Sequence, residues 1–432
     1  PRESAGEATT PRALLPIPPL PSLSVSSALH PASLRTFSLL RLLPPTTRRG
    51  GLSPPPRHLM PSAKSYASSP SRLSLLSPLE LSEWMDSASP PLLLEASHGA
   101  NKPEAHIPGA VLVYMEQIDL YHEEAPGRPA RVHGNYNLKP SHELKAALEA
   151  AGVTASRPTV VYTQSFKQGA AEPIVAARLA WALAYAGVEH VLLLGGGMHA
   201  WREAGLSVST TPSERPRNPP DFFFGYDASI QEANVANDAP SGVTPPFPRN
   251  PHYLAATPDV HAAIRSCQPC EAATGGACAA VSENARQAIL ADVRSWREFV
   301  GEGHDYPFDL PHGRIPTARW AQWGPSTYVG GDFFSPMTGA LLPLSHVRAL
   351  WHGPQSDLFG TASGKDALAN AQAAPARVIF YCGSGWRSSL AWCLARLMGY
   401  EDCANYDGGF LEWSMLHPDA ESHPIVTGVE RS

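Results

Sequence analysis

The second half of the chain repeats the pattern of the first. A shift of 212 positions superimposes three pairs of landmark residues: Gly187 on Gly399, Gly196 on Gly408 and Trp201 on Trp413. The segments 106–110 and 314–318 also share an Ile-Pro pair and a final Ala. A repeat of this length is the size of a domain, so each half must be able to fold into a similar unit. We therefore expect two related domains.

Short apolar runs alternate with helical stretches in both halves. The runs lie at 92–94, 160–162 and 191–194, and then at 289–291, 378–381 and 404–406. The clearest helix, 388–398, keeps its apolar residues at helical spacing and stops at Gly399. Strands that alternate with helices form a parallel sheet with helices on both faces. The predicted fold class is therefore α/β, with two similar domains of this kind.

Composition separates a leader and a linker from the two domains. Residues 1–79 carry nine basic and two acidic residues, whereas residues 80–432 carry 24 basic and 37 acidic ones. An Arg- and Ser-rich segment with few acids is typical of an organellar transit peptide, although a disordered Pro/Ser-rich tail has a similar composition. We predict a mitochondrial location, with cytoplasm or plastid as alternatives. The predicted boundaries are a disordered leader over 1–74, a first domain over 75–206, a Pro-rich linker over 207–252 and a second domain over 253–432.

Charge and cysteine content exclude several classes of protein. The net charge of −6 is too small to suggest a nucleic-acid partner. No apolar run approaches the roughly 18 residues of a membrane span. Six cysteines in 432 residues, all after position 266, do not make a disulfide-stapled secreted scaffold. We expect a monomer that needs no cofactor and binds neither nucleic acid nor membrane.

One cysteine lies where parallel sheets place reactive groups. Cys382 follows the strand at 378–381, and ligands of open α/β sheets bind at the carboxyl ends of strands. Its sulfur would face a helix N-terminus, next to a Gly-rich turn whose amides can converge on one point and next to Arg387. These three features favour the thiolate that a sulfur nucleophile requires. A buried structural role suits Cys393 and Cys403 better.

The length of the loop indicates which chemistry it serves. Four residues separate Cys382 from Arg387, namely Gly383, Ser384, Gly385 and Trp386. A phosphatase cradle has five residues between its Cys and its Arg, which is enough to surround a tetrahedral oxyanion. The smaller ring suits a single sulfur atom bound to the cysteine. Sulfur transfer is therefore favoured over phosphoryl transfer.

These features together resemble the tandem-rhodanese sulfurtransferases, in particular the bacterial and fungal branch with a Cys-Gly-x-Gly-Trp-Arg loop. The resemblance covers about 77–428 and rests on the loop, on Asp-Val-Arg-Ser-Trp at 292–296 and on Gly-Arg-Ile-Pro at 313–316. It implies that Cys382 takes a sulfane sulfur from a donor and passes it to cyanide or to a thiol such as thioredoxin or glutathione. It also implies that only the second domain carries a nucleophile. In the first domain, aligned strands place Thr163 opposite Cys382, whereas aligned helices place Ala170 there.

The resemblance also implies roles for residues around Cys382. The predicted substrate-binding set is Gly383, Ser384, Gly385, Trp386, Arg387 and Arg294, with Asp292 and Ser388 in support. Asp292 and Arg294 either bind substrate or pair with each other to brace the loop, and bracing is favoured because an unpaired buried charge is costly. Many relatives carry an Arg where this chain has Glu298. Thiosulfate is the favoured donor because Arg387 suits a dianion. Two alternatives stay open: a 3-mercaptopyruvate donor, suggested by Ser384, and a persulfide carrier without turnover.

Other residues with chemical potential are expected to be structural. We predict that His106 is a core or rim residue, that Asp407 caps a turn, and that Trp201 and Trp413 are buried. His261, Cys267, Cys270 and Cys278 lie close enough in sequence for a zinc site. Because no second Cys-x-x-Cys pair follows, we predict unpaired thiols and no metal.

Overall fold

The computed structural model describes most of the two predicted domains. The described residues are 71–99, 103–125, 128–129, 132, 134–164, 172–213, 247–267, 288–304, 306, 309–324, 332–335, 341–353, 356, 358, 377–416 and 421–428. Residues 1–70 of the predicted leader and the middle of the predicted linker, 214–246, lie outside them. Among the helices within these ranges, none combines the length and the apolar character needed to cross a membrane.

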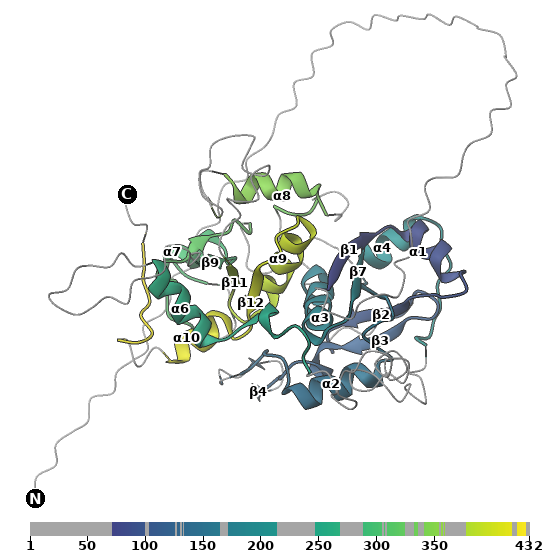
Figure 1. The fold of residues 1–432 in the computed structure, drawn as a ribbon, viewed down its shortest axis with the longest axis horizontal. Helices are drawn as coiled ribbons and strands as arrows, with labels where there is room; N and C mark the ends of the chain where they lie inside the picture. Colours follow the sequence, from purple (N-terminus) through teal and green to yellow (C-terminus); the bar gives the residue numbers. More distant parts are fainter. Residues whose placement is uncertain are drawn as a thin grey trace, which may run out of the picture. The chain divides into compact units, whose positions relative to one another are not determined.

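The first domain contains a five-stranded parallel sheet in the order β1-β7-β6-β2-β3 (Figure 1). Its strands are β1 (Arg72–Leu76), β2 (Leu92–Ser97), β3 (Val111–Tyr114), β6 (Thr159–Tyr162) and β7 (His190–Leu194). Its helices are α1 (Pro78–Met85), α2 (Ser141–Ala150), α3 (Glu172–Ala186) and α4 (Gly197–Glu203). A 3-10 turn, η1 (Met115–Gln117), and a small antiparallel pair, β4 (Glu123–Ala125) with β5 (Arg128–Pro129), complete the elements.

The second domain repeats this arrangement strand for strand. Its parallel sheet has the order β8-β12-β11-β9-β10 when read from the edge that corresponds to β1. The strands are β8 (Leu254–Ala255), β9 (Ile289–Asp292), β10 (Arg319–Trp320), β11 (Val378–Tyr381) and β12 (Cys403–Tyr406). The helices are η2 (Pro251–Tyr253), α6 (Thr257–Cys267), α7 (Trp296–Val300), α8 (Leu344–Trp351), α9 (Trp386–Leu397) and α10 (Gly409–Leu416). The predicted duplication and the α/β class are confirmed.

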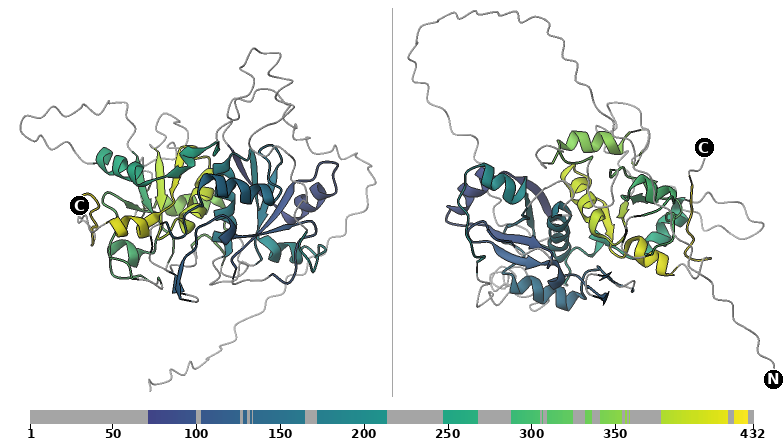
Figure 2. Two further views of the ribbon diagram at one scale, coloured as in Figure 1. Left: turned by 90° about the horizontal axis from the view of Figure 1, so that it is seen from below. Right: turned by 180° about the vertical axis from the view of Figure 1, so that it is seen from behind.

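Successive side chains of the central strands point to opposite faces of the sheet, so they pack in different hydrophobic cores. On β11, Ile379 joins a core with α6 and α10, whereas Phe380 joins a larger core with α9. On β6, Val160 and Val161 divide in the same way. The larger core is shared by both domains, because α3 and α9 pack against each other (Figure 1 and Figure 2). Helix α9, which follows the Cys382 loop, therefore packs against the first domain.

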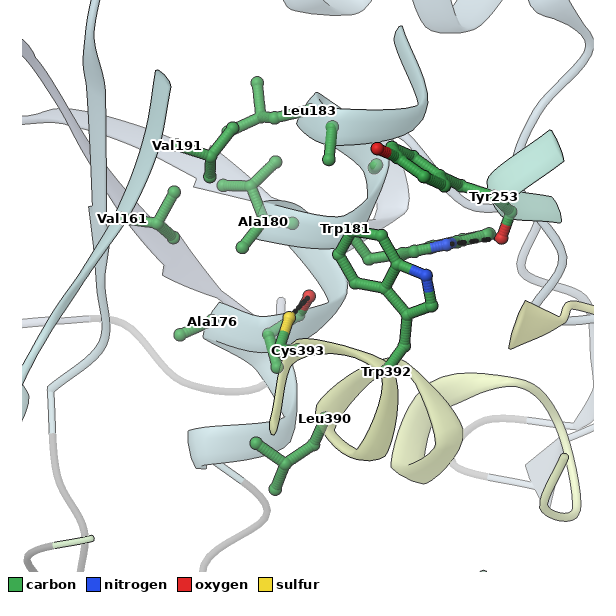
Figure 3. Close-up of a cluster of buried hydrophobic side chains, with 14 of the residues drawn as sticks. Val161, Ala176, Ala180, Trp181, Leu183, Val191, Tyr253, Leu390, Trp392 and Cys393 are labelled. Atoms are coloured by element: carbon green, nitrogen blue, oxygen red, sulfur yellow. Dashed lines mark hydrogen bonds between the residues drawn. The ribbon is translucent and has the colours of Figure 1, made fainter. Parts of the chain in front are cut away.

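Large aromatic side chains fill this shared core. Trp181 of α3 donates through its indole nitrogen to the carbonyl of Tyr253 at 3.0 Å, and the ring of Tyr253 meets that of Trp392 on α9 edge-on (Figure 3). The Cys393 sulfur lies 3.6 Å from the carbonyl oxygen of Ala177 on α3. Burial raises the pKa of Cys393 far above the usual range of a thiol, so this cysteine is structural, as predicted.

Three predicted boundaries differ from the structure. Strand β1 begins at Arg72, inside the predicted leader. Its Ser- and Leu-rich sequence does not indicate a strand by itself, and its pairing with β7 defines it. Helix α9 begins at Trp386 rather than at 388, because Gly385 adopts a φ of +77° and turns the chain directly into the helix. The end of the predicted linker is also packed: the Asn250 side chain is buried and donates to the carbonyl of Ala184 at 2.8 Å.

Candidate active site

Cys382 occupies the turn between β11 and α9. Its side chain is 1% exposed, and the hydroxyl of Ser388 lies 3.5 Å from its sulfur. The first hydrogen bond within α9 runs from the Ser389 amide to the carbonyl of Gly385 at 3.2 Å. The amides of 386–388 therefore precede the helical ladder and carry the partial positive charge of a helix N-terminus.

The loop is fixed in place through its carbonyl groups. The carbonyls of Cys382 and Gly383 accept from the amides of Phe410 and Leu411, both at 2.7 Å, and the carbonyl of Gly385 accepts from the Asn405 side chain at 3.0 Å. In a trans peptide the N–H points away from the carbonyl of the same unit. The amides that follow these three carbonyls are therefore turned to the opposite side of the loop. Such a set of amides suits an anion held on the cysteine sulfur.

Gly385 makes this loop geometry possible, which gives a first testable prediction. A Cβ at Gly385 would overlap the carbonyl of Asp407, whereas Gly399, also at positive φ (+91°), faces open space. An Ala at positive φ costs about 1–2 kcal/mol, and overpacking adds about 1–3 kcal/mol. We expect Gly385→Ala to lower the free energy of unfolding by more than Gly399→Ala does, and to slow turnover. Urea unfolding of both variants checks this, and equal losses would contradict the close approach.

Arg387 is held in an ion pair beside the loop, and its predicted substrate-binding role stays a prediction. The side chain is buried, and its two terminal nitrogens donate to the two carboxylate oxygens of Glu298 at 3.1 and 3.0 Å. Burial alone would raise the pKa of Glu298, but the guanidinium of Arg387 lowers it to about 2. A buried guanidinium requires such a partner. Arg387 therefore ties the first turn of α9 to α7.

Tyr306 covers the loop and was not identified from the sequence. The guanidinium of Arg387 donates to its hydroxyl, and a Cβ at Gly383 would overlap that same hydroxyl. Burial raises the pKa of Tyr306 far above its ordinary value, so the hydroxyl keeps its proton. Because Gly383 has no side chain, the tyrosine can approach the backbone next to Cys382.

Asp292 and Arg294 pair with each other at the end of β9. Arg294 donates to both carboxylate oxygens of Asp292, at 2.9 and 2.6 Å, and to the carbonyl of Gly313 at 2.7 Å. The hydroxyl of Tyr381 donates to Asp292 at 2.8 Å. All of these side chains are buried. The contacts agree with the predicted bracing role and give no support to the substrate-binding alternative for Arg294.

The first domain has no thiol at the matching position. The Met198 amide donates to the carbonyl of Thr163, just as the Phe410 amide donates to that of Cys382, so the alignment by strands is the correct one. Ala170 lies outside the described residues. His106 is buried, with Nδ1 at 2.6 Å from Glu95, and is the core histidine that the sequence predicts. Trp201 and Trp413 are also buried, as expected.

Asp407 has a different role from the predicted turn cap. Its carboxylate is buried and accepts from Arg178 of the first domain at 2.6 Å and from the Leu138 amide at 2.8 Å. Arg178 is fully buried and also donates to Asp119 at 2.9 Å. Two carboxylates thus share one guanidinium. Burial raises the pKa of Asp119 to about 6, although Arg178 acts in the opposite direction.

The cysteines near 270 give no metal centre among the described residues. His261 lies with Nε2 at 3.0 Å from Nε2 of His423, and the sulfur of Cys267 lies 3.4 Å from the carbonyl of Ala288. Cys270 and Cys278 are outside the described ranges. Within those ranges no group of three or more His, Cys, Asp or Glu side chains is arranged to hold a metal ion.

Comparison with known proteins identifies the family of the two domains. The model of the rhodanese-like domain family matches residues 77–204 and 279–416. The chain therefore belongs to the rhodanese-like proteins and, because both halves match, to the tandem-rhodanese sulfurtransferase family. The thiosulfate sulfurtransferase YnjE of Escherichia coli is 27% identical over 342 residues, which are 78% of this chain and 59% of YnjE. The crystal structure of YnjE superimposes with a TM-score of 0.57 at 24% identity, covering 82% of this chain and 68% of that chain.

Two further relatives bear on the chemistry. A putative thiosulfate sulfurtransferase of Haloferax volcanii is 54% identical over 132 residues, which are 29% of this chain and 38% of the relative. A structure of EanB, solved as a cysteine persulfide in a tetrahedral intermediate state with ergothioneine, superimposes with a TM-score of 0.54 at 25% identity. That match covers 78% of this chain and 65% of the EanB chain.

Proposed function

We propose that the protein transfers a sulfane sulfur from thiosulfate to cyanide or a thiol through a persulfide on Cys382. The observation that carries the proposal is the loop itself: a buried thiol at the N-terminus of α9, whose neighbouring carbonyls are hydrogen-bonded to α10 and β12. A terminal persulfide sulfur carries a full negative charge, and fixed amides that point away from those carbonyls would offset that charge without reorganising. The names of the YnjE and Haloferax relatives support thiosulfate as donor.

The two half-reactions balance without a proton donor. The Cys382 thiolate attacks the outer sulfur of thiosulfate, the S–S bond of the donor breaks, and sulfite leaves with the electron pair. An acceptor thiolate or cyanide then attacks the terminal sulfur of the persulfide. The bond between the two sulfurs breaks and the Cys382 thiolate is restored. The proposal includes glutathione or thioredoxin as the thiol acceptor, and it retains the predicted monomer and mitochondrial location.

A 3-mercaptopyruvate donor is the second candidate, and two hydroxyls favour it. When this donor loses its sulfur, its carbon must take up a proton to become pyruvate. The hydroxyl of Ser388 lies 3.5 Å from the Cys382 sulfur, and Tyr306 keeps its proton beside the loop. The ion pair of Arg387 with Glu298 also removes the argument that Arg387 selects a dianion. The choice of donor must therefore be measured.

Comparative kinetics of wild type and Ser388→Ala separate the candidates. We expect a higher kcat/KM with thiosulfate than with 3-mercaptopyruvate, measured as thiocyanate formed from cyanide. Removing a general acid costs about 100-fold or more when a proton transfer is required, so only the mercaptopyruvate rate should fall in the variant. A preference for mercaptopyruvate would overturn the proposed donor. Persulfide formation without turnover would instead identify a sulfur carrier.

A further inference from the structure

Trp386, the first residue of α9, belongs to a closed circuit of four aromatic side chains beside the Cys382 loop. The other three members come from the first domain. Neighbouring ring centroids are separated by 5.6 Å for His98–Tyr121, 5.5 Å for Tyr121–Tyr136, 6.3 Å for Tyr136–Trp386 and 6.0 Å for Trp386–His98. All four side chains are partly exposed. We call this set the aromatic circuit.

The rings of the aromatic circuit are steeply inclined to one another. The angles between neighbouring planes, taken in the same order, are 79°, 67°, 82° and 64°. Steep angles around a closed circuit exclude a stacked arrangement of the four rings. A cation within about 6 Å of the centroid of one of these partly exposed rings is attracted by the ring quadrupole.

The backbone of Tyr136 gives an independent sign of a binding site. Its φ is +71°, a conformation that bulky residues rarely adopt. Three hydrogen bonds hold it there: its amide donates to Leu120 at 2.8 Å, and its carbonyl accepts from Arg178 at 2.9 Å and from the Trp386 indole at 3.3 Å. Backbone strain of this kind persists only where the surroundings over-determine it, and it clusters at ligand sites. The hydrogen bond from the Trp386 indole links the Tyr136 main chain to another member of the aromatic circuit.

The charges around the aromatic circuit are negative. The Glu116 carboxylate lies 3.5 Å from Nε2 of His98, and burial together with Glu123 raises the pKa of Tyr121. Beneath Tyr136, the positive charge of Arg178 is offset by its two buried carboxylates. The aromatic circuit itself is therefore a poor site for an anion. It suits an organic cation.

We propose that the aromatic circuit binds the alkylated ammonium group of a small thiol that acts as sulfur acceptor. The acceptor role rests on the proposed function, whereas the binding of the ammonium group does not. With its cationic end held by the circuit next to Trp386, the acceptor presents its thiolate to the persulfide on Cys382. The thiolate attacks the terminal sulfur, the bond to the Cys382 sulfur breaks, and the acceptor leaves as its own persulfide.

Calorimetric titration with choline and with its neutral isostere 3,3-dimethylbutan-1-ol tests the binding step. Cys382→Ser protein is used beside wild type, so that no sulfur chemistry contributes. Choline should bind about tenfold more tightly than the isostere, as one or two cation–π contacts provide. Tyr121→Leu should remove most of that difference, whereas Tyr121→Phe should keep it. Trp84→Leu, which alters a partly buried tryptophan of α1 outside the circuit, serves as the matched control.

Acceptor kinetics test the second step. With thiosulfate as donor, thiocholine should give a kcat/KM about tenfold above that of 3,3-dimethylbutane-1-thiol, and Tyr121→Leu should narrow this ratio. Equal affinity for choline and its isostere, no saturable binding, or an equal loss in Trp84→Leu would overturn the proposal and leave the rings as mutual packing only. If no thiocyanate forms, the proposed function is wrong. The calorimetric titration would still show whether the aromatic circuit binds a cation.

Discussion

Replacing Cys382 with Ser is expected to abolish sulfur transfer, with a loss of at least about a thousandfold in kcat. A hydroxyl in this position is a far weaker nucleophile than a thiolate and cannot form a persulfide. The loop itself should survive, because its hydrogen bonds to Phe410 and Leu411 are made by main-chain carbonyls. Thiocyanate formation measures the rate, and mass spectrometry of donor-treated protein shows whether a sulfur atom has been added.

Two other cysteines provide matched controls for this variant. Cys267→Ser alters a partly exposed thiol on α6 and should leave the rate unchanged. Cys393→Ser alters a buried thiol between α3 and α9, so it should lower stability but leave persulfide formation intact. Retained turnover in Cys382→Ser, or a sulfur adduct that maps to another cysteine, would show that the nucleophile has been assigned wrongly.

The central strands and the cysteine loop were predictable because their signals are local. The apolar runs at 160–162 and 378–381 became β6 and β11, whose side chains are buried on both faces. The glycines around Ser384 marked the turn before α9. In contrast, four strands of the two parallel sheets escaped prediction, namely β1, β3, β8 and β10. Strands β8 and β10 have only two residues each, β3 alternates buried and half-buried positions, and β1 has no buried residue. Pairing with a neighbour therefore defines these strands.

The partners of the charged residues could not be predicted, because tertiary packing chooses them. Arg387 and Glu298 are 89 positions apart, and Arg178 and Asp407 are 229 apart. One signal was available. Arg178 is the only basic residue of the helix 172–186, and the only other charged residue is Glu172 at its first position. A charge in the middle of a helix that is otherwise apolar on all sides must find a buried partner.

The second prediction with a large effect concerns the buried ion pairs of Arg178. We expect Arg178→Met to lower the free energy of unfolding by about 3–5 kcal/mol at pH 8, because Asp119 and Asp407 would be left as uncompensated buried charges. Methionine keeps much of the volume of the arginine side chain, so packing changes little. Arg157→Met is the matched control. The Arg157 guanidinium donates only to the carbonyls of Pro90 and Pro91, at 3.3 and 3.2 Å, and its removal should cost less than about 1 kcal/mol.

The pH dependence of Arg178→Met distinguishes lost charge compensation from lost packing. Burial already raises the pKa of Asp119 to about 6 and also raises that of Asp407, in both cases against the effect of Arg178. Without Arg178 both pKa values should rise further. A carboxyl whose folded pKa exceeds its unfolded value of about 3.9 contributes stability below that value and loses it as the pH rises through the folded pKa. The deficit of the variant should therefore be smaller at pH 5 than at pH 8 in urea unfolding. The added change Asp119→Asn should recover part of the deficit at pH 8. Equal deficits at both pH values would show instead that the variant fails through packing.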